Sequence, residues 1–456
     1  MFIWKKLTRS TEPIFSFSFG KKIKNVGFIS TRLQGTDGVS LETEKWSVVL
    51  ERMGYSCYYF AGQSDWDKQK TMVVPEAFFD HPSVKKIQAE CFGKFTRASS
   101  LTGDIHHLRK HLKQKIYEFV SRYNIQLIIP ENALTIPMHI PLGLAITEFI
   151  AETGISAIAH HHDFYWERQR FMINCVPDFL AMAFPPQFNS MQHVVINSPA
   201  ERELSYRTGL SARVIPNMLD FETPPPGIDD YNQDVRADLG LAPDDIMFLQ
   251  PTRIVARKGI EHAIEVVNRL NDPKIKLVIT HFGGDEGPAY EERIRNYAAM
   301  LNVPLIIKPE IINRTRAVSP DGKKQYTLWD VYPHADVVTY PSMFEGFGNA
   351  LLEAIYFRKP LLVNRYSIYE IDIEPLGFDM VTMDGYVTQG VIAQMQEILR
   401  DPARRERMTT NNYQVASQFF SYQALAYKLK TLLIEFEGLQ ILGMTGKEIP
   451  VVQGKT

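Results

Sequence analysis

Short apolar segments alternate with longer amphipathic segments along most of the chain. Apolar runs such as residues 25–30 and 125–130 are separated by segments like residues 104–123, in which apolar side chains recur at three- and four-residue spacing. Short apolar runs bounded by turn residues are typical of buried strands, whereas three- and four-residue spacing predicts helices. The alternation therefore predicts parallel sheets with helices on both faces.

In the first half of the chain this pattern predicts a doubly wound domain. Residues 64–100 have no clear period, so they receive no assignment. The expected strands are 25–30, 55–60, 125–130, 155–160, 193–197 and 213–215, and the expected helices are 41–53, 104–123, 137–153 and 199–208.

A stretch rich in Pro and Asp, residues 224–230, interrupts the alternation and has the composition of a linker. The alternation already pauses at residues 214–220, just before this stretch, and we place the domain boundary there, which divides the chain into residues 24–215 and 216–420. Alternation resumes afterwards, except in the polar and basic residues 308–324, which predict a mobile loop. The expected strands are 246–250, 275–280 and 303–307, and the expected helices are 259–270, 290–300, 327–332, 391–399 and 402–436.

The stretch from Val337 to Val363 predicts a strand, a loop, a helix and a second strand. Its loop contains Glu345 within a Gly-rich turn, and its helix contains Glu353. Because ligands of open α/β sheets bind beyond the carboxyl ends of the strands, both carboxylates are expected to face a cleft there.

Composition narrows the class of protein without changing this picture. The length of 456 residues suggests two or three domains, and the net charge of −2 gives no reason to expect nucleic acid or an anionic membrane as a partner. Three widely spaced cysteines, Cys57, Cys91 and Cys175, predict a reducing, cytoplasmic setting and no zinc site.

The termini carry no predicted domain of their own. No apolar run approaches the roughly 18 residues of a spanning helix. Residues 1–23 are basic and aromatic, without the apolar core of an export signal, and predict a flexible extension; peripheral docking to a membrane is the alternative. Residues 437–456 predict a loosely held tail.

Arg253 and Lys258 follow the expected strand 246–250 at the start of a helix. The free N–H groups and the dipole of a helix start favour anions, so two cations there can clamp a diphosphate. Exposed basic residues at a helix start are also common without any ligand, and that explanation stays open for the pair taken alone.

The two acids of the 337–363 stretch are acceptors for sugar hydroxyls. Glu353 can accept hydrogen bonds from a ribose diol and Glu345 from another sugar, while backbone N–H groups of residues 346–350 can contact an anion. Taken singly, each acid is better explained as an ordinary residue of a helix or its first turn. The residues in question are Gly346, Phe347, Gly348, Asn349 and Ala350.

His160, His161, His162 and Asp163 follow the expected strand 155–160. Three consecutive histidines cannot all face one way, so they predict no metal site by themselves. One histidine at a strand end beside an acid suits substrate binding or proton transfer near neutral pH. A polar loop anchored by Trp166 explains the segment equally well.

Other polar groups also follow strands of the first domain. The turn after the first strand contains Gly35, Thr36, Asp37 and Gly38, whose backbone could approach a phosphate or a sugar. It has neither a dinucleotide fingerprint nor a P-loop spacing. Glu131 and Asn132 follow the strand ending at Pro130 and are candidates for binding an acceptor.

Together these motifs resemble the retaining glycosyltransferases of family four. The resemblance rests on Arg253 with Lys258, on Glu345-Gly-Phe-Gly with Glu353, on the Val214-Ile-Pro-Asn segment and on the first glycine turn, and it covers most of residues 24–436. It implies an α/β protein of the GT-B fold, with two Rossmann-like doubly wound domains facing each other across a cleft. Residues 421–436 are then expected to form a helix that crosses back to the N-terminal domain.

The resemblance also implies roles for residues. The N-terminal domain binds the acceptor and the C-terminal domain the nucleotide-sugar. Arg253 and Lys258 hold the donor diphosphate, Glu353 the ribose, Glu345 the transferred sugar, and His162 contacts that sugar, with His160 and His161 as alternatives. Gly38 joins the donor site, and the acceptor site is formed from Gly35, Thr36, Asp37, Glu131, Asn132, His160, His161 and Asp163.

The implied reaction moves a hexose from GDP-mannose or UDP-glucose to a hydroxyl of a small sugar or glycoside. The configuration of the sugar is retained, no cofactor is required, and a divalent metal is not implied. Departures after Val363 and in the histidine segment indicate a subgroup, similar to enzymes that build small glycosides such as mannosylglucosylglycerate.

Other functions on the same fold stay open at this point. A nucleotide-sugar epimerase needs an acid or base at the sugar's second carbon, which the sequence does not exclude. A phosphorylase needs a Schiff-base lysine, for which there is no signature. A non-catalytic nucleotide-sugar-binding protein would keep the same basic and acidic residues.

Overall fold

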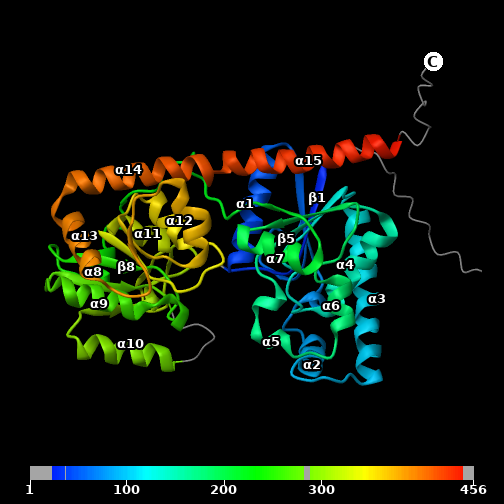
Figure 1. The fold of residues 1–456 in the computed structure, drawn as a ribbon, viewed down its shortest axis with the longest axis horizontal. Coiled ribbons are helices and arrows are strands. Elements are labelled where there is room, and N and C mark those ends of the chain that lie inside the picture. Colours follow the sequence, from blue (N-terminus) through cyan, green and yellow to red (C-terminus); the bar gives the residue numbers. More distant parts are fainter. Residues whose placement is uncertain (1–22, 36, 282–287, 445–456) are drawn as a thin grey trace, which may run out of the picture.

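The protein folds into two lobes, each built on its own sheet (Figure 1). The computed structural model describes residues 23–35, 37–281 and 288–444, with the side chains of 437–444 excepted. Of the predicted N-terminal extension only Ile23 is described, and it is buried in the core. Most of the predicted tail, residues 445–456, lies outside the described residues.

The first lobe contains a seven-stranded parallel sheet in the order β3-β2-β1-β4-β5-β6-β7. Gly27 in β1 pairs with Tyr58 of β2 on one side and Ile128 of β4 on the other, and the strand order reverses between β1 and β4. The strands are β1 Asn25–Leu33, β2 Ser56–Ser64, β3 Thr71–Val73, β4 Leu127–Pro130, β5 Ser156–His161, β6 Met191–Val195 and β7 Ala212–Val214.

Helices cover both faces of this sheet. Ile128 and Ala157 face α3 and α4, whose apolar sides form one core, while Phe28 and Ile158 face the core that contains Trp46 of α1. The described helices of this lobe are α1 Gly38–Arg52, α2 Pro82–Cys91, α3 Ser99–Arg122, α4 Ile140–Thr153, α5 Gln169–Met172, α6 Pro177–Ala183 and α7 Ser198–Thr208.

The second lobe contains a six-stranded parallel sheet in the order β10-β9-β8-β13-β14-β15. Its strands are β8 Ile246–Gln250, β9 Ile275–Ile279, β10 Leu305–Ile307, β13 Val337–Tyr340, β14 Leu361–Asn364 and β15 Val381–Met383. Its helices are α8 Val235–Leu239, α9 Ile260–Leu270, α10 Ala289–Met300, α11 Leu328–Val331, α12 Asn349–Tyr356, α13 Gln389–Arg400 and α14 Pro402–Phe419. The two doubly wound sheets confirm the predicted fold class.

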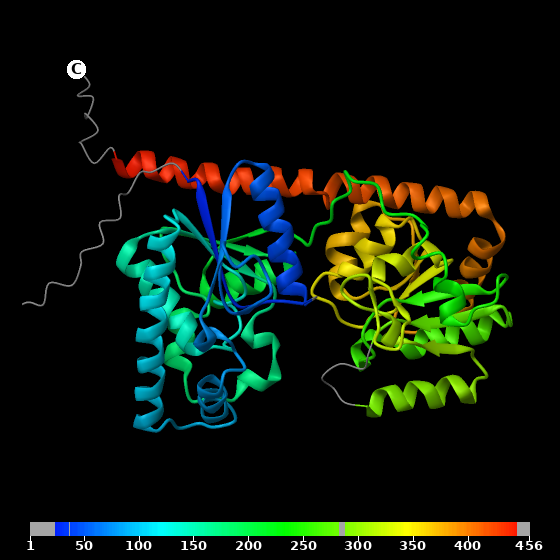
Figure 2. The ribbon, with the colours of Figure 1, turned by 180° about the vertical axis from the view of Figure 1, so that it is seen from behind.

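The last helix, α15 Tyr422–Met444, continues the line of α14 and lies along the first lobe (Figures 1 and 2). It packs against α1, and Lys428 Nζ donates a hydrogen bond to the carbonyl oxygen of Val214 at 3.2 Å. The helix was expected to end near residue 436, and that boundary is wrong. A glycine such as Gly438 costs a helix interior only about 1 kcal/mol, which is too little to end a long helix.

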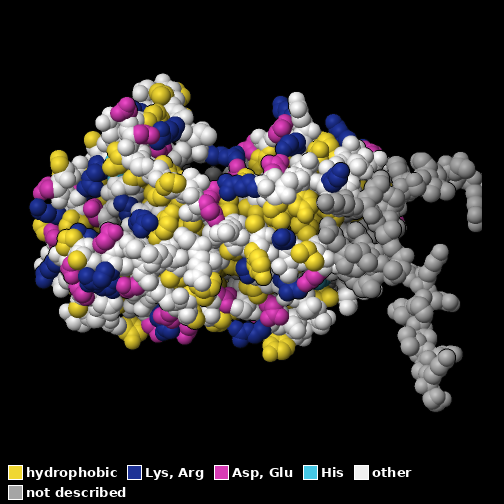
Figure 3. All heavy atoms as spheres, turned by 90° about the horizontal axis from the view of Figure 1, so that it is seen from above, with side chains coloured by type: hydrophobic (Ala, Val, Ile, Leu, Met, Phe, Trp, Pro, Cys, Tyr) yellow, Lys and Arg dark blue, Asp and Glu magenta, His cyan; other side chains and the backbone are white. Residues whose placement is uncertain are grey.

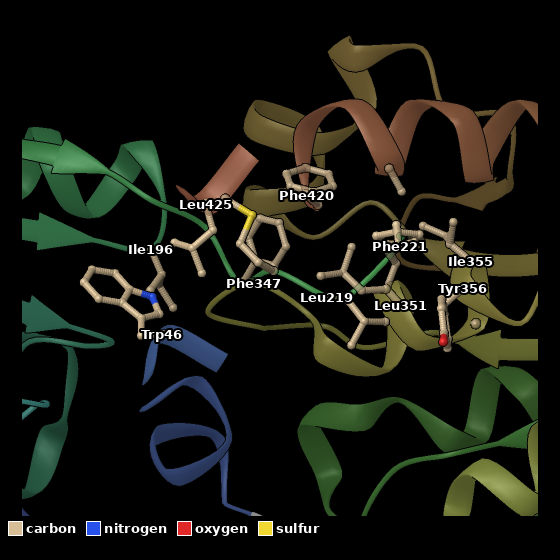
Figure 4. Close-up of a cluster of buried hydrophobic side chains, with 14 of the residues drawn as sticks. Trp46, Ile196, Leu219, Phe221, Phe347, Leu351, Ile355, Tyr356, Phe420 and Leu425 are labelled. Carbon is tan, nitrogen blue, oxygen red and sulfur yellow. The ribbon is translucent and has the colours of Figure 1, made fainter. Parts of the chain in front are cut away.

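Apolar side chains from both lobes meet beneath α15. Figure 4 shows Phe347 beside Leu425 and Phe420, with Leu219 below them and Trp46 and Ile196 on the side of the first lobe. Because this core is continuous across the junction, the lobes are joined by packing as well as by the chain.

Two other predictions are corrected. Residues 308–324 are not an aperiodic loop, because β11 Ala317–Val318 and β12 Lys324–Gln325 pair as a hairpin. Arg316 holds this hairpin through ion pairs to Asp229 and Asp330. Residues 402–436 are helical as predicted but not continuous, and the second part is the expected crossing helix. Phe420 ends α14, and its carbonyl oxygen accepts a hydrogen bond from Leu219 N at 2.9 Å.

The outer face of α14 and α15 carries basic and acidic side chains interspersed with apolar ones (Figure 3). This mixture fits the net charge of −2. Within the described part of the chain, no helix is long and apolar enough to cross a membrane.

Candidate active site

Two turns of the second lobe lie side by side because β8 and β13 are neighbouring strands. The turn after β8 contains Gly259, which has a φ of +59°. A Cβ at that position would lie 2.3 Å from the carbonyl oxygen of Pro341, which begins the turn after β13. Met343 N also donates to Arg257 O at 2.8 Å. The two turns therefore form one surface at the carboxyl edge of the sheet.

Glu345 joins these turns through its side chain. One carboxylate oxygen forms an ion pair with Lys258 Nζ, and the other lies 3.1 Å from Arg257 Nη1. Lys258 and Glu345 are each only 8% exposed. The sequence brings Lys258 and Glu345 to one edge, and the structure adds Arg257 as a third member.

The side chains of Glu345, Lys258 and Arg257 together carry a net positive charge. Burial opposes ionisation of Glu345, but the attraction of Lys258 and Arg257 outweighs it and lowers the pKa of Glu345. Burial lowers the pKa of Lys258, and the neighbouring Arg257 and Arg253 add to that effect against the pull of Glu345. The pKa of His281 falls to about 4 because of burial and the nearby charges of Lys258 and Arg253.

Arg253 is the exposed member of the cluster. Among the described residues its guanidinium has no hydrogen bond or ion pair. Two cations, Arg257 and Lys258, thus contact a single carboxylate, and Arg253 lies near enough to Lys258 to lower the pKa of that lysine. The excess charge lies where α9 and α12 begin, and helix starts add to the attraction for an anion.

Glu353 is the second acid of the site. Its carboxylate accepts hydrogen bonds from the Tyr332 hydroxyl at 3.0 Å and from the Trp329 indole at 3.4 Å. Burial raises the pKa of Glu353, and Lys45 of the first lobe works against that shift. Each carboxylate oxygen has a second lone pair, so Glu353 can still accept hydrogen bonds from a ligand.

The glycine turn after Glu345 is tied to the first lobe. Asn197 Nδ2 donates to Gly346 O at 2.8 Å, and Asn217 Nδ2 donates to Asn349 Oδ1 at 2.9 Å. A Cβ on Gly346 would lie 3.9 Å from the carbonyl oxygen of His162. The turn that carries Glu345 and the histidine segment of the first lobe are therefore neighbours in space.

In the first lobe, His160 and His162 point to one side of their segment. His160 Nδ1 lies 2.9 Å from Glu131 Oε2, and His162 Nε2 lies 3.5 Å from the same oxygen. Trp46 stacks on His160 with 4.2 Å between ring centroids. His161 points the other way, with its ring nitrogens near Thr135 Oγ1 at 2.6 Å and His193 Nδ1 at 3.0 Å. His161 is thus a core residue and not part of this group.

Glu131 and His160 are buried, and burial shifts the pKa of each side chain. Burial raises the pKa of Glu131 to about 7, although His162 opposes that shift. Burial also lowers the pKa of His160 to about 4. Possible ligand atoms of Glu131, His160 and His162 lie within 4.8 Å of one another, so this set could hold a metal ion. The hydrogen bond between His160 and Glu131 also accounts for the arrangement without one.

The remaining predicted residues of the first lobe lie around this group. Asn132 accepts a hydrogen bond from His162 N at 3.2 Å and donates one to Asp163 at 3.3 Å. Gly35 lies in the turn after β1, and Gly38 begins α1. Thr36 lies outside the described residues.

Asp37 has a structural partner for both carboxylate oxygens. It caps α1 by accepting hydrogen bonds from Val39 N and Ser40 N, each at 3.2 Å, while the Ser40 hydroxyl donates to its other oxygen. Its proposed contact with an acceptor would therefore compete with a helix cap.

Several residues of the site escaped prediction. Arg257 directly precedes Lys258, so the sequence held a local signal for it. Asn197 had only its place at a strand end, and Asn217 only its place in the Val214-Ile-Pro-Asn segment. Their partners lie more than a hundred residues away in the chain. His281 follows β9, and its place near the end of that strand was the only indication of it in the sequence.

Comparisons with known proteins agree with this geometry. Residues 313–415 match the family described as glycosyl transferases group 1. The chain is 33% identical over 383 residues to a mannosylglucosylglycerate synthase of Petrotoga mobilis, covering 78% of this chain and 86% of that protein. It is 29% identical over 422 residues to the enzyme of that name from Thermotoga maritima, covering 85% and 95%.

A solved structure shares the fold as well. A glycosyltransferase of Rickettsia africae superimposes with a TM-score of 0.67 at 10% identity, covering 91% of this chain and 99% of that one. The architecture is thus the GT-B fold of glycosyltransferases, as predicted. The chain belongs to the group 1 glycosyltransferases, and its similarity to the two synthases extends over both lobes.

Proposed function

We propose that this glycosyltransferase moves a hexose from a nucleotide diphosphate sugar to a hydroxyl of a small sugar or glycoside, with retention of the anomeric configuration. The observation that carries the proposal is the pairing of Arg257 and Lys258 with Glu345, with Arg253 beside Lys258, at the starts of two helices. Such a surplus of positive charge suits a diphosphate leaving group, whose negative charge grows as the bond to the sugar breaks.

The donor contacts that we propose are those the family resemblance implies, and the positions described above support them. Lys258 and Arg253 hold the diphosphate, and Arg257 supports it through Glu345. Glu345 and the backbone of Gly346 to Ala350 bind the transferred sugar, while Glu353 accepts from the ribose hydroxyls. His162 faces the sugar from the other lobe, and Glu131 keeps its ring in place. The cations neutralise the leaving group, so the scheme requires no cofactor.

The reaction then proceeds on one face of the sugar. The acceptor hydroxyl attacks the anomeric carbon from the side on which the diphosphate leaves. The new C–O bond forms as the bond to the phosphate oxygen breaks, and that oxygen takes the proton of the hydroxyl. No carboxylate nucleophile is needed, in contrast to a retaining hydrolase with its pair of acids.

The names of the two relatives point to the substrates. Their product joins mannose, glucose and glycerate, so by analogy we propose GDP-mannose as the donor and a glucosylglycerate-like glycoside as the acceptor. UDP-glucose is the alternative donor. The described cysteines are free and buried, which supports the cytoplasm as the place of the reaction.

Replacing Lys258 by Ala tests the diphosphate site. Because Glu345 keeps Arg257 as a partner, the fold is expected to persist, as circular dichroism would show. Loss of one stabilising donor of this kind lowers turnover about 100- to 1,000-fold. The measurement is release of nucleotide diphosphate from GDP-mannose in the presence of glucosylglycerate.

Lys274→Ala is the matched control. Lys274 precedes β9 at the opposite edge of the sheet and pairs with exposed Asp244, so this variant should keep the wild-type rate. Wild-type turnover in K258A would contradict the assignment of the diphosphate site.

A further inference from the structure

A pocket of about 290 Å³ opens in the first lobe between α2 and α5, outside the predicted site residues. Its walls include the rings of Phe79, Phe92 and Phe171 and two basic side chains, Lys85 and Arg170. Pockets that are mostly apolar with a few placed polar groups are typical of small-ligand sites, whose volumes begin at about 300 Å³. The volume suits one sugar-sized group and excludes a macromolecule.

Arg170 is the unusual member of this pocket. Within the described part of the chain its guanidinium has neither an ion pair nor a hydrogen bond; its recorded contact is with the ring of Phe171, 4.6 Å from the centroid. Arg170 is exposed at the mouth of the pocket. Partial burial and the neighbouring Arg168 lower its pKa, against the attraction of Asp163. An arginine whose guanidinium forms no ion pair is complementary to an anionic ligand.

Lys85 contributes less to the charge of the pocket. It forms an ion pair with Asp80 at 2.8 Å, and the two side chains are 60% and 50% exposed. Exposed pairs of this kind contribute little free energy, so an anion could compete for Lys85. No carboxylate lines the pocket.

The pocket adjoins the candidate active site on two sides. Arg32, which lies 3.3 Å from Asp37 of the β1 turn, has its guanidinium 5.3 Å from the ring centroid of Phe79. On the other side, Arg170 is two residues from Arg168, which is paired with Asp163 at 2.5 Å. A ligand in the pocket would therefore extend from the acceptor side of the cleft.

We propose that this pocket binds the carboxylate end of an acidic glycoside acceptor, with Arg170 as the carboxylate ligand and the phenylalanine rings around the attached carbon chain. The proposal rests on the proposed function, since it names the acceptor class of that reaction. The hydroxyl that attacks the sugar would then be at the opposite end of the acceptor, nearer to His162.

The test compares an acid with its neutral analogue. Glucosylglycerate and its methyl ester would be offered to the wild-type protein, to Arg170→Gln and to Arg202→Gln, with GDP-mannose as donor. Arg202 is an exposed arginine of α7 outside the pocket, which makes it the matched control. Circular dichroism checks the fold of each variant.

The expected result is selective loss of affinity for the acid. Hydrogen bonds to a charged group contribute about 1.5–3 kcal/mol, so R170Q should raise KM for glucosylglycerate about tenfold or more at nearly unchanged kcat. The ester should be used equally by all three proteins, and R202Q should match the wild type. An unchanged preference of R170Q for the acid over the ester would overturn the proposal.

Calorimetric binding of both probes separates this proposal from the proposed function. If the wild type transfers no mannose to either probe, the substrate assignment fails, and calorimetry alone decides the pocket. Tighter binding of the acid than of the ester, lost in R170Q and kept in R202Q, would still support the pocket. Equal binding of acid and ester to the wild type would overturn it.

Discussion

At the level of single residues, the proposed activity depends on a buried ion pair whose surroundings carry excess positive charge. Lys258 and Glu345 are both nearly buried, and burying such a pair costs desolvation energy that their attraction only partly offsets. Arg257 and Arg253 add further positive charge beside it. The arrangement is better explained as a preorganised anion site than as a means of stabilising the fold.

Gly259 sets the position of Lys258, which makes it a second test of the site. In G259A the left-handed backbone costs about 1–2 kcal/mol, and the added Cβ would also meet Pro341 O at 2.3 Å. We expect G259A to have lower turnover. Its unfolding free energy should fall by more than the cost of the left-handed backbone alone. Denaturant unfolding and initial rates measure both.

Gly209→Ala is the matched comparison, because Gly209 has a φ of +75° with no atom within 4 Å of the added Cβ. G209A should lose only the free energy that the left-handed backbone costs an alanine, and it should keep full activity. Equal losses of stability and activity in the two variants would refute the role of the contact with Pro341.

The buried side chain of His139 is expected to make the free energy of unfolding depend on pH. It caps α4, with Nδ1 accepting from Leu142 N at 3.1 Å and Nε2 near Glu76 O at 2.8 Å, and burial lowers its pKa from 6.5 to about 4. The pKa of His139 is lower in the folded protein than in the unfolded chain. Its neutral form therefore stabilises the fold above pH 6.5, and this stabilisation is lost as the pH falls towards 4. The loss for one such group is about 3 kcal/mol.

His139→Asn keeps a capping acceptor and removes this titration. Between pH 6.5 and 4 the unfolding free energy of H139N should therefore fall by about 3 kcal/mol less than that of the wild type. His107→Asn, at an exposed position of α3, should follow the wild type. Parallel pH profiles for H139N and the wild type would disprove the assignment.

At the level of helices and strands, most of them were predicted from the sequence, but fewer of their first and last residues were. The strand at residues 246–250 was predicted with the bounds it has, because charged residues precede it and Pro251 follows. β1 runs on to Leu33 because pairing of Leu33 with Ser64 of β2 continues past the apolar run. α2 was missed, since its buried residues Val84, Ile87 and Cys91 lie among charged ones.

The element that joins the lobes offers a direct test of packing. Leu429 in α15 is fully buried in the junction core, so Leu429→Ala should lower the unfolding free energy by about 2–5 kcal/mol. Tyr427 on the same helix is 75% exposed, and Tyr427→Ala should stay within about 0.5 kcal/mol of the wild type. Similar denaturation midpoints for both variants would show that α15 does not stabilise the first lobe.

At the scale of the whole molecule, the site depends on contacts between lobes. Asp372 of the second lobe accepts a hydrogen bond from Ser198 N at the start of α7 at 2.7 Å, and Asn197 beside it holds Gly346. These contacts keep the turn of Glu345 next to the histidine segment. They join residues well over a hundred positions apart, so no local pattern in the sequence could predict them.

The sequence did place the main charged groups at the carboxyl edges of two sheets, because the ends of strands and the starts of helices are local signals. It could not predict that Lys258 pairs with Glu345, or that His160 and His162 share Glu131. Those pairings depend on which strands become neighbours and on which way each side chain turns.

The anomeric configuration of the product is the most direct test of the central claim. The wild-type protein would be incubated with GDP-mannose, whose mannose is α-linked, and glucosylglycerate, and the new linkage assigned by proton and carbon NMR. The account predicts an α-mannoside formed together with one nucleotide diphosphate per transfer. A β-mannoside would contradict retention, and release of free mannose without a glycoside would contradict transfer to this acceptor.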